Sequence, residues 1–249
     1  MNICFKKVLY FVEISYFVED NYLVMSDMKD QRQMSETMRL AIVLAIAGGF
    51  MDAYSYICRG GVFANAETGN IVLMAINFSN GHLPKALQYL IPITAFALGV
   101  VVSEIIRLKN NEQGMFHWRQ ISLIIEIIAL VISAFLPQSM NLIVNSLISF
   151  TCGTQVATFA KFHGYAMATT MCTGNLRSGT QNLCEFFIQK DRKLLDKAFA
   201  YYGCIVFFII GAIIGKFVSD TYNEKAILVA SALLLVAFIM MFIDTNKRD

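Results

Sequence analysis

Six stretches of this sequence each continue for close to 20 residues with at most two charged side chains. A helix of about 20 residues is about 30 Å long, which is the thickness of the hydrocarbon core of a bilayer. The hydrocarbon core holds no water that could hydrogen-bond to peptide groups. A stretch that crosses it therefore forms a helix, in which the peptide groups bond to one another. The sequence therefore predicts an all-α, polytopic membrane protein with six principal transmembrane helices at 40–57, 88–106, 118–136, 141–160, 198–218 and 226–243.

The composition is also typical of a protein whose main partner is the lipid bilayer. Apolar residues make up 57% of the 249 residues and charged residues only 15%, whereas soluble domains average about 45–50% and about 25%. The net charge of +2 is not gathered into a basic stripe with interleaved aromatic residues, so no nucleic-acid partner is expected.

Two further segments, 64–79 and 166–188, are helix-like but shorter or more polar. Each could be a span, a re-entrant piece or an interfacial helix, so eight spans are the alternative to six. Lys and Arg collect in cytoplasmic loops, and six spans concentrate them before the first helix, after the second and after the fourth. Charge thus favours six spans with both the N-terminus and the C-terminus in the cytoplasm.

Three regions follow from this interpretation. Residues 1–38 are expected to be a cytoplasmic tail, with Met25, Met28, Met34 and Met38 as alternative starts. Residues 39–244 form the helical membrane domain, and residues 245–249 form a short cytoplasmic C-terminal tail.

The membrane domain contains an internal repeat in its sequence. Thr68-Gly69-Asn70 recurs as Thr173-Gly174-Asn175 at an offset of 105, and at the same offset Gly48 falls on Gly153. The pair Gly99 and Ser103 likewise matches Gly211 and Gly215 at an offset of 112. Two copies, at about 40–136 and 141–243, explain these matches. Copies of three spans would be inverted and copies of four would be parallel, and the sequence leaves both open.

These residues also carry a resemblance to a known family. The chain resembles the YoaK-like family of bacterial multi-pass membrane proteins over roughly residues 40–243, a family whose molecular function is not established. The resemblance implies a location in the bacterial cell (cytoplasmic) membrane and no particular chemistry. The family's second copy often reads Gln-Asn-Ala where this chain has Gln155-Val156-Ala157, so no amide role transfers to position 156. The matching residues are Gly49-Phe50-Met51-Asp52-Ala53, Ala64, Thr68-Gly69-Asn70, Phe96-Ala97-Leu98-Gly99 and Thr173-Gly174-Asn175.

Polar residues inside the predicted spans are the candidates for a binding site. Asp52, Tyr56 and Arg59 share one face of the first helix, and Thr151, Gln155 and Thr158 share a face of the equivalent helix. The first stripe predicts either a pathway-lining acid with Arg59 as its counter-charge or a structural ion pair. The second predicts hydrogen bonds across helices or the other half of a site.

Each Thr-Gly-Asn segment suggests a helix that starts inside the membrane. Glycine permits a break, while Thr and Asn are residues that cap new helix starts. The alternative is tight helix packing at Gly69 and Gly174. Asn70 and Asn175 are predicted to be functional equivalents that face a shared cavity. The full candidate substrate-binding set is Asp52, Tyr56, Glu67, Thr68, Gly69, Asn70, Gln155, Thr158, Thr173, Gly174 and Asn175.

No signature of catalysis is present in the sequence. The three histidines lie in separate loops without triad or metal-ligand spacing, and no phosphate-binding loop appears, so we expect no enzyme, no cofactor and no metal site. The leading hypothesis is a small secondary transporter or permease-like protein for a small solute or coupling ion, with a homodimer as a further expectation. The alternative is a non-transporting scaffold or accessory subunit.

Overall fold

The computed structural model describes residues 37–109, 117–162 and 164–243. The chain divides into two units, 1–33 and 34–249, and every described residue belongs to the second. The predicted tails, except for residues 37 and 38, therefore lie outside the described residues, as does most of the loop between 107 and 119.

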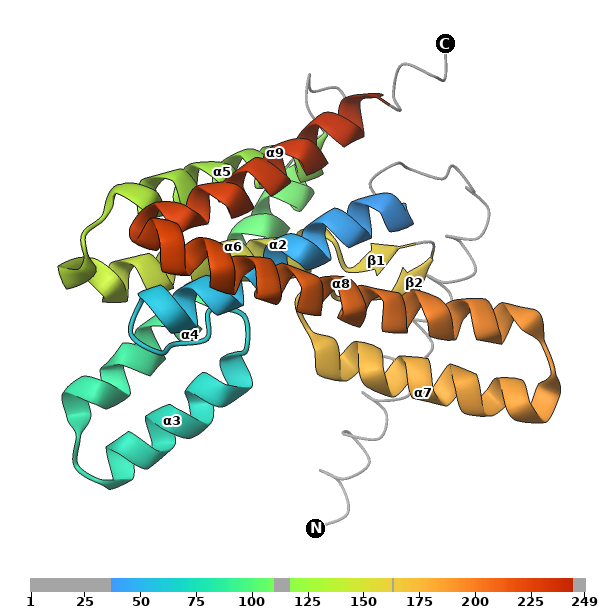
Figure 1. Ribbon diagram of the computed structural model, residues 1–249, viewed down its shortest axis with the longest axis horizontal. Helices are drawn as coiled ribbons and strands as arrows, with labels where there is room; N and C mark the ends of the chain where they lie inside the picture. The colour runs from blue at the N-terminus through green and yellow to red at the C-terminus, as the bar shows by residue number, and fades with distance from the viewer. Residues whose placement is uncertain (1–36, 110–116, 163, 244–249) are drawn as a thin grey trace, which may run out of the picture. The chain divides into compact units, whose positions relative to one another are not determined.

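The described ranges are almost entirely helical, which confirms the predicted class (Figure 1). The strands in these ranges, β1 (Lys161–Phe162) and β2 (Tyr165–Ala166), pair in antiparallel fashion as a short hairpin. The α-helices are α2 (Met38–Cys58), α3 (Glu67–Ser79), α4 (Leu83–Lys109), α5 (Trp118–Phe135), α6 (Asn141–Thr158), α7 (Cys172–Gln189), α8 (Arg192–Tyr222) and α9 (Leu228–Ile243), with short 3-10 turns η2 (Gln138–Met140) and η3 (Asn223–Ile227).

Among the described residues, four helical stretches are long and apolar enough to cross a membrane: Met38–Cys58, Leu83–Lys109, Trp118–Phe135 and Arg192–Met241. The last stretch contains α8, η3 and most of α9. Helix α6 fills the predicted segment 141–160 but is not among the four, because polar side chains such as Asn145, Thr154 and Gln155 lower its hydropathy. A membrane protein is thus supported by apolar helices.

The Thr-Gly-Asn segments each begin a separate helix. Helix α3 has 13 residues, so it is about 20 Å long and too short to cross the hydrocarbon core. Helix α7 has 18 residues but many polar ones. The segments 64–79 and 166–188 therefore contain helices of the short or polar kind that the sequence suggests.

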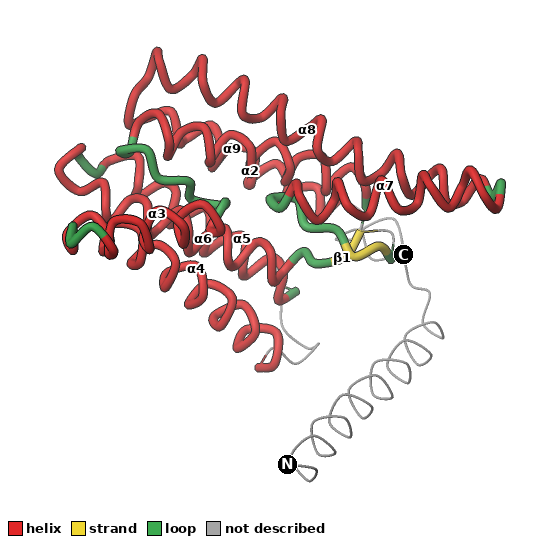
Figure 2. The backbone as a smooth tube through the Cα atoms, turned by 90° about the horizontal axis from the view of Figure 1, so that it is seen from below, coloured by secondary structure: helices red, strands yellow, loops and turns green. Residues whose placement is uncertain are grey.

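The two most extensive helix contacts join helices that are not consecutive in the chain (Figures 1 and 2). The most extensive pairings place α2 along α8 and α4 along α6, while α3 packs on α4 and α7 packs on α8. Glycines allow the two long contacts to be close. A Cβ atom on Gly49 would stand 1.9 Å from the carbonyl oxygen of Phe208, and one on Gly153 would stand 2.1 Å from that of Phe96.

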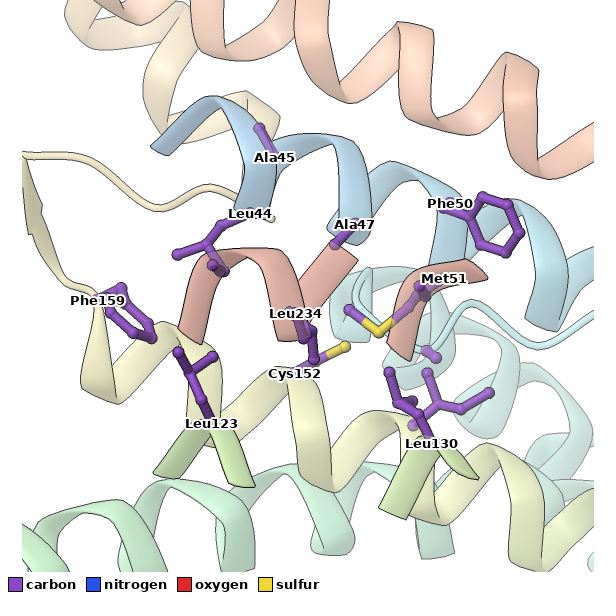
Figure 3. Close-up of a cluster of buried hydrophobic side chains, with 14 of the residues drawn as sticks. Leu44, Ala45, Ala47, Phe50, Met51, Leu123, Leu130, Cys152, Phe159 and Leu234 are labelled. Carbon is purple, nitrogen blue, oxygen red and sulfur yellow. The ribbon is translucent and has the colours of Figure 1, made fainter. Parts of the chain in front are cut away.

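A buried apolar cluster lies between α2, α5, α6 and α9 (Figure 3). Leu44 and Met51 of α2 meet Leu123 of α5, Cys152 of α6 and Leu234 of α9 in this cluster. The described cysteines are free thiols, and Cys152 and Cys204 are buried. On the outer surface, α3, α4 and α8 expose large apolar residues, including Phe78, Leu108 and Phe217, which suits contact with lipid.

Candidate functional site

Asp52 lies on α2, a helix that is buried along most of its length. Its side chain is only 8% exposed, and its Oδ1 atom accepts a hydrogen bond from the backbone N–H of Asn65 at 2.8 Å. An acid at bilayer depth costs about 2.5–3.5 kcal/mol on insertion scales, so such residues usually serve a pathway or a partner. Asp52 is therefore the central residue of the candidate site.

The segment between α2 and α3, residues 59–66, is non-helical and folds back against α2. Asn65 donates its Nδ2–H to the carbonyl oxygen of Gly48 at 2.7 Å, and the N–H of Ala64 donates to Ser55 Oγ at 3.2 Å. Ala64 and Asn65 are both buried. Non-helical backbone is tolerated at membrane depth only where protein or a water-filled cavity satisfies its polar groups, and here α2 supplies the partners.

A second non-helical segment, residues 159–162 and 164–171, reaches the same turn of α2 from the other half of the chain. Gln155 Nε2 donates to Thr169 Oγ1 at 3.0 Å and to the carbonyl oxygen of Leu44 at 3.3 Å. The Cγ2 atom of Thr170 lies 2.8 Å from the position that a Cβ on Gly48 would occupy. The segments that precede α3 and α7 therefore meet at Gly48, one helical turn before Asp52.

The two Thr-Gly-Asn segments make the same hydrogen bond. Asn70 Nδ2 donates to the carbonyl oxygen of Phe63 at 2.6 Å, and Asn175 Nδ2 donates to that of Ala168 at 2.7 Å, seven residues earlier in each case. The expected helix caps are wrong, because the residues at the cap positions are Ala66 and Met171 and neither makes a side-chain cap bond. Each asparagine instead ties the start of its helix to the preceding segment.

The glycines of these segments are not explained by tight packing. A Cβ on Gly69 would come no closer than 3.9 Å to Phe63, and a Cβ on Gly174 would meet nothing within 4 Å. Thr68, Thr173 and Gly174 are not buried at the starts of their helices. In the described structure, an alanine would therefore fit at either glycine.

Replacing Asn70 or Asn175 with leucine is expected to lower the stability of the folded protein by about 1–3 kcal/mol, because a partly buried carbonyl would lose its donor. Thermal unfolding of each purified variant in detergent measures the loss. Asn182→Leu is the matched control, since Asn182 bonds to Ser178 within its own helix. Equal Tm values for all three variants would contradict this role.

Several buried oxygen atoms near Asp52 lack hydrogen-bond partners. Glu67 Oε2 accepts from Asn70 Nδ2 at 3.0 Å, but Glu67 Oε1 has no partner. Four more of the unpartnered oxygens belong to residues already placed at this site: Asn65 Oδ1, Asn70 Oδ1, Gln155 Oε1 and Thr170 Oγ1. Others belong to Glu126, Asn145, Ser149, Thr151 and Ser219.

Arg59 does not serve as the counter-charge of Asp52. This arginine is fully buried and donates to Tyr54 Oη at 2.8 Å, Asn141 Oδ1 at 3.2 Å and the carbonyl oxygen of Ser133 at 3.0 Å. Among the described residues, neither Asp52 nor Glu67 takes part in an ion pair. Helical spacing placed Arg59 on the stripe of Asp52, but its long side chain is held by α5 and α6.

The structure brings some of the predicted residues together and separates others. Asp52, Glu67, Asn70 and Gln155 are linked through the segments that meet at Gly48. Tyr56 is 51% exposed and stacks on Phe63 with ring centroids 4.6 Å apart. The Thr158 hydroxyl lies 2.9 Å from Ser103 Oγ, a bond that joins α6 to α4. Asn175 donates to Ala168, as described above, and also contacts Cys204 Sγ at 3.4 Å.

Sequence reasoning missed Asn65, Thr169 and Thr170. The repeat could have found two of them, because Asn65 and Thr170 are separated by the same offset of 105 that relates Asn70 to Asn175. Each lies five residues before its asparagine. Applying the offset to every polar residue, and not only to the motif, would have added both to the candidate site.

Two other observations limit the chemistry. Within the described ranges, no group of three or more His, Cys, Asp or Glu side chains is placed to hold a metal ion. Glu126 on α5 is fully buried, and neither carboxyl oxygen has a hydrogen-bond partner. The potential ligand atoms around Asp52 are oxygen atoms of two carboxylates, of amide side chains and of a hydroxyl.

Comparisons with known proteins agree with a membrane location. Residues 40–240 match a family model described as "Protein of unknown function (DUF1275)". The chain is also similar to the UPF0700 transmembrane protein YoaK of Bacillus subtilis (strain 168), with 24% identity over 184 residues that cover 70% of this chain and 80% of that protein. No solved structure matches the chain.

Proposed function

The chain belongs to the DUF1275 family, and from that premise we propose that it is a small secondary transporter whose solute passes the site at Gly48 and Asp52. The observation that carries the proposal is the meeting of two non-helical segments on one turn of α2, where Asn65 of one and Thr170 of the other are buried. Helices that start from such segments inside the membrane are the sites where secondary transporters bind solutes and coupling ions.

An internal repeat supports this proposal. The first helix of each half packs on the third helix of the other half, as α2 on α8 and α6 on α4. Close glycine contacts occur in both of these helix pairs. Between α8 and α2, a Cβ on Gly211 would stand 2.1 Å from the carbonyl oxygen of Ile46, and between α4 and α6, a Cβ on Gly99 would stand 2.2 Å from that of Phe150. We propose that α2–α5 and α6–α9 are two copies of one unit.

Six spans with inverted copies fit this unit. Helices α2, α4 and α5 would cross in the first copy and α6, α8 and α9 in the second, with α3 and α7 as partial helices. An odd number of spans inverts the second copy. Placing both termini in the cytoplasm puts the basic loop that begins near Arg107 on the same side, as the distribution of Lys and Arg favours.

Single cysteines at Gln113 and Ser139 would then be labelled from opposite sides of sealed cells.

Counterflow in proteoliposomes tests transport across several classes of solute at once. Vesicles preloaded with unlabelled amino acids, nucleobases, sugars or carboxylates would be offered the labelled compound of the same class. We expect one class to accumulate transiently, and Asp52→Asn to abolish the accumulation because it removes the charge at the meeting point. Glu104→Gln is the control, since Glu104 is exposed and pairs with Arg107 at 2.6 Å.

A non-transporting scaffold is the second candidate. It is favoured by the bonds of Asn70 and Asn175, both of which satisfy carbonyls within their own segments. A scaffold predicts no counterflow with any class, together with normal membrane insertion of the Asp52→Asn variant.

A further inference from the structure

We propose that the Asp52 and Glu67 side of this site binds one hard monovalent metal cation of the size of Na⁺. This inference rests on the proposed function, because it assigns the coupling ion of the same transport site. The proposed ligands are carboxylate and amide oxygens, which is the oxygen chemistry that hard cations prefer.

Hydrogen bonds join the two acids and the two amides as two pairs, Asp52 with the backbone of Asn65 and Glu67 with Asn70, and a single residue separates Asn65 from Glu67 in the chain. The backbone N–H of Asn65 donates to Asp52 Oδ1, while Asn65 Nδ2 is engaged by Gly48. Asn70 Nδ2 is engaged by Phe63 and by Glu67 Oε2. Because both amide nitrogens are occupied, Asn65 Oδ1 and Asn70 Oδ1 remain as buried acceptors without donors, and so does Glu67 Oε1.

A buried cluster of acceptors with two negative charges needs a positive partner. Among the described residues none is at hand: Arg59 is engaged by Tyr54, Asn141 and Ser133, and Arg177 is exposed on α7. A proton on one carboxyl would satisfy a single acceptor. A metal cation is coordinated by several at once, which accounts for amides that both present their oxygen.

The ligand set favours a monovalent cation over a divalent one. Ca²⁺ takes roughly six to eight oxygens and Mg²⁺ dehydrates reluctantly, whereas this cluster has two carboxylates, each with one oxygen already hydrogen-bonded. Two acids also fall short of the acid-rich groups typical of divalent sites, and in the described ranges no group of three or more His, Cys, Asp or Glu side chains is placed to hold a metal ion.

Sodium binding to the purified full-length protein tests this proposal. Tm would be measured in detergent with NaCl, KCl, MgCl₂, CaCl₂ or N-methyl-D-glucamine chloride at equal ionic strength, and ²²Na⁺ binding would be measured on the same preparations. We expect NaCl alone to raise Tm in a saturable manner, because a ligand that binds only the folded state stabilises it. Asp52→Asn and Glu67→Gln should lose both the shift and the ²²Na⁺ binding, while Glu104→Gln should keep them.

The Tm of Asp52→Asn without sodium shows whether this variant is folded. Removing a buried charge that lacks a counter-charge should leave that Tm equal to or above the wild-type value, so a variant that is folded and insensitive to sodium supports the site. Equal Tm values in all five salts, stabilisation by lowered pH alone, or a shift only with MgCl₂ or CaCl₂ would overturn the proposal. Counterflow that proceeds equally without sodium would overturn it while leaving transport intact, whereas sodium binding without counterflow would count against transport alone.

Discussion

Replacing Gly49 with alanine is expected to prevent most of the protein from reaching its folded state. The new Cβ would stand 1.9 Å from the carbonyl oxygen of Phe208 and 2.8 Å from its carbonyl carbon. These are backbone atoms, so no side-chain rotation can relieve the clash and α2 and α8 would have to separate. Overpacking usually costs about 1–3 kcal/mol, and we expect a loss at or above the upper end of that range.

Fluorescence-detected size exclusion of a fusion to a fluorescent protein measures the folded fraction in detergent. The matched control is Gly203→Ala on α8, because a Cβ there would meet nothing within 4 Å and alanine is favoured over glycine in a helix. A monodisperse Gly49→Ala peak as high as that of Gly203→Ala would show that α2 and α8 do not pack as closely as the structure places them.

Replacing Arg59 with methionine is expected to give the second largest loss. The guanidinium donates to α5 through the carbonyl oxygen of Ser133 and to the start of α6 through Asn141 Oδ1. Methionine fills much of the volume but leaves both acceptors without their donor, at about 1–3 kcal/mol each. We therefore expect the free energy of unfolding to fall by about 3 kcal/mol or more.

Thermal unfolding in detergent measures this loss, and Arg59→Lys refines it. Lysine keeps the charge but cannot present a planar fork to separated acceptors, so we expect an intermediate Tm. Arg107→Met is the control, since its exposed pair with Glu104 contributes about 0–1 kcal/mol. Equal losses for Arg59→Met and Arg107→Met would rule out the structural role of Arg59.

Four residues of the site could be anticipated from their polarity, and the rest depended on side-chain reach. Asp52, Glu67, Asn70 and Gln155 were singled out as polar residues in apolar surroundings, and the structure links them around Gly48. Arg59 was assigned to Asp52 because helical spacing places both on one face. Spacing gives the direction of Cβ only, whereas a long arginine chain binds wherever acceptors lie.

The sequence by itself determined the helical membrane class, because the hydropathy of each stretch is set by its own residues and a stretch that lies in hydrocarbon must satisfy its peptide groups within a helix. It also marked the starts of α3 and α7. Only the tertiary structure decided that two segments more than 90 residues apart meet at Gly48, and that Gly49 faces α8. Such contacts depend on how stretches of similar hydropathy pack against one another, and hydropathy does not distinguish one apolar helix from another.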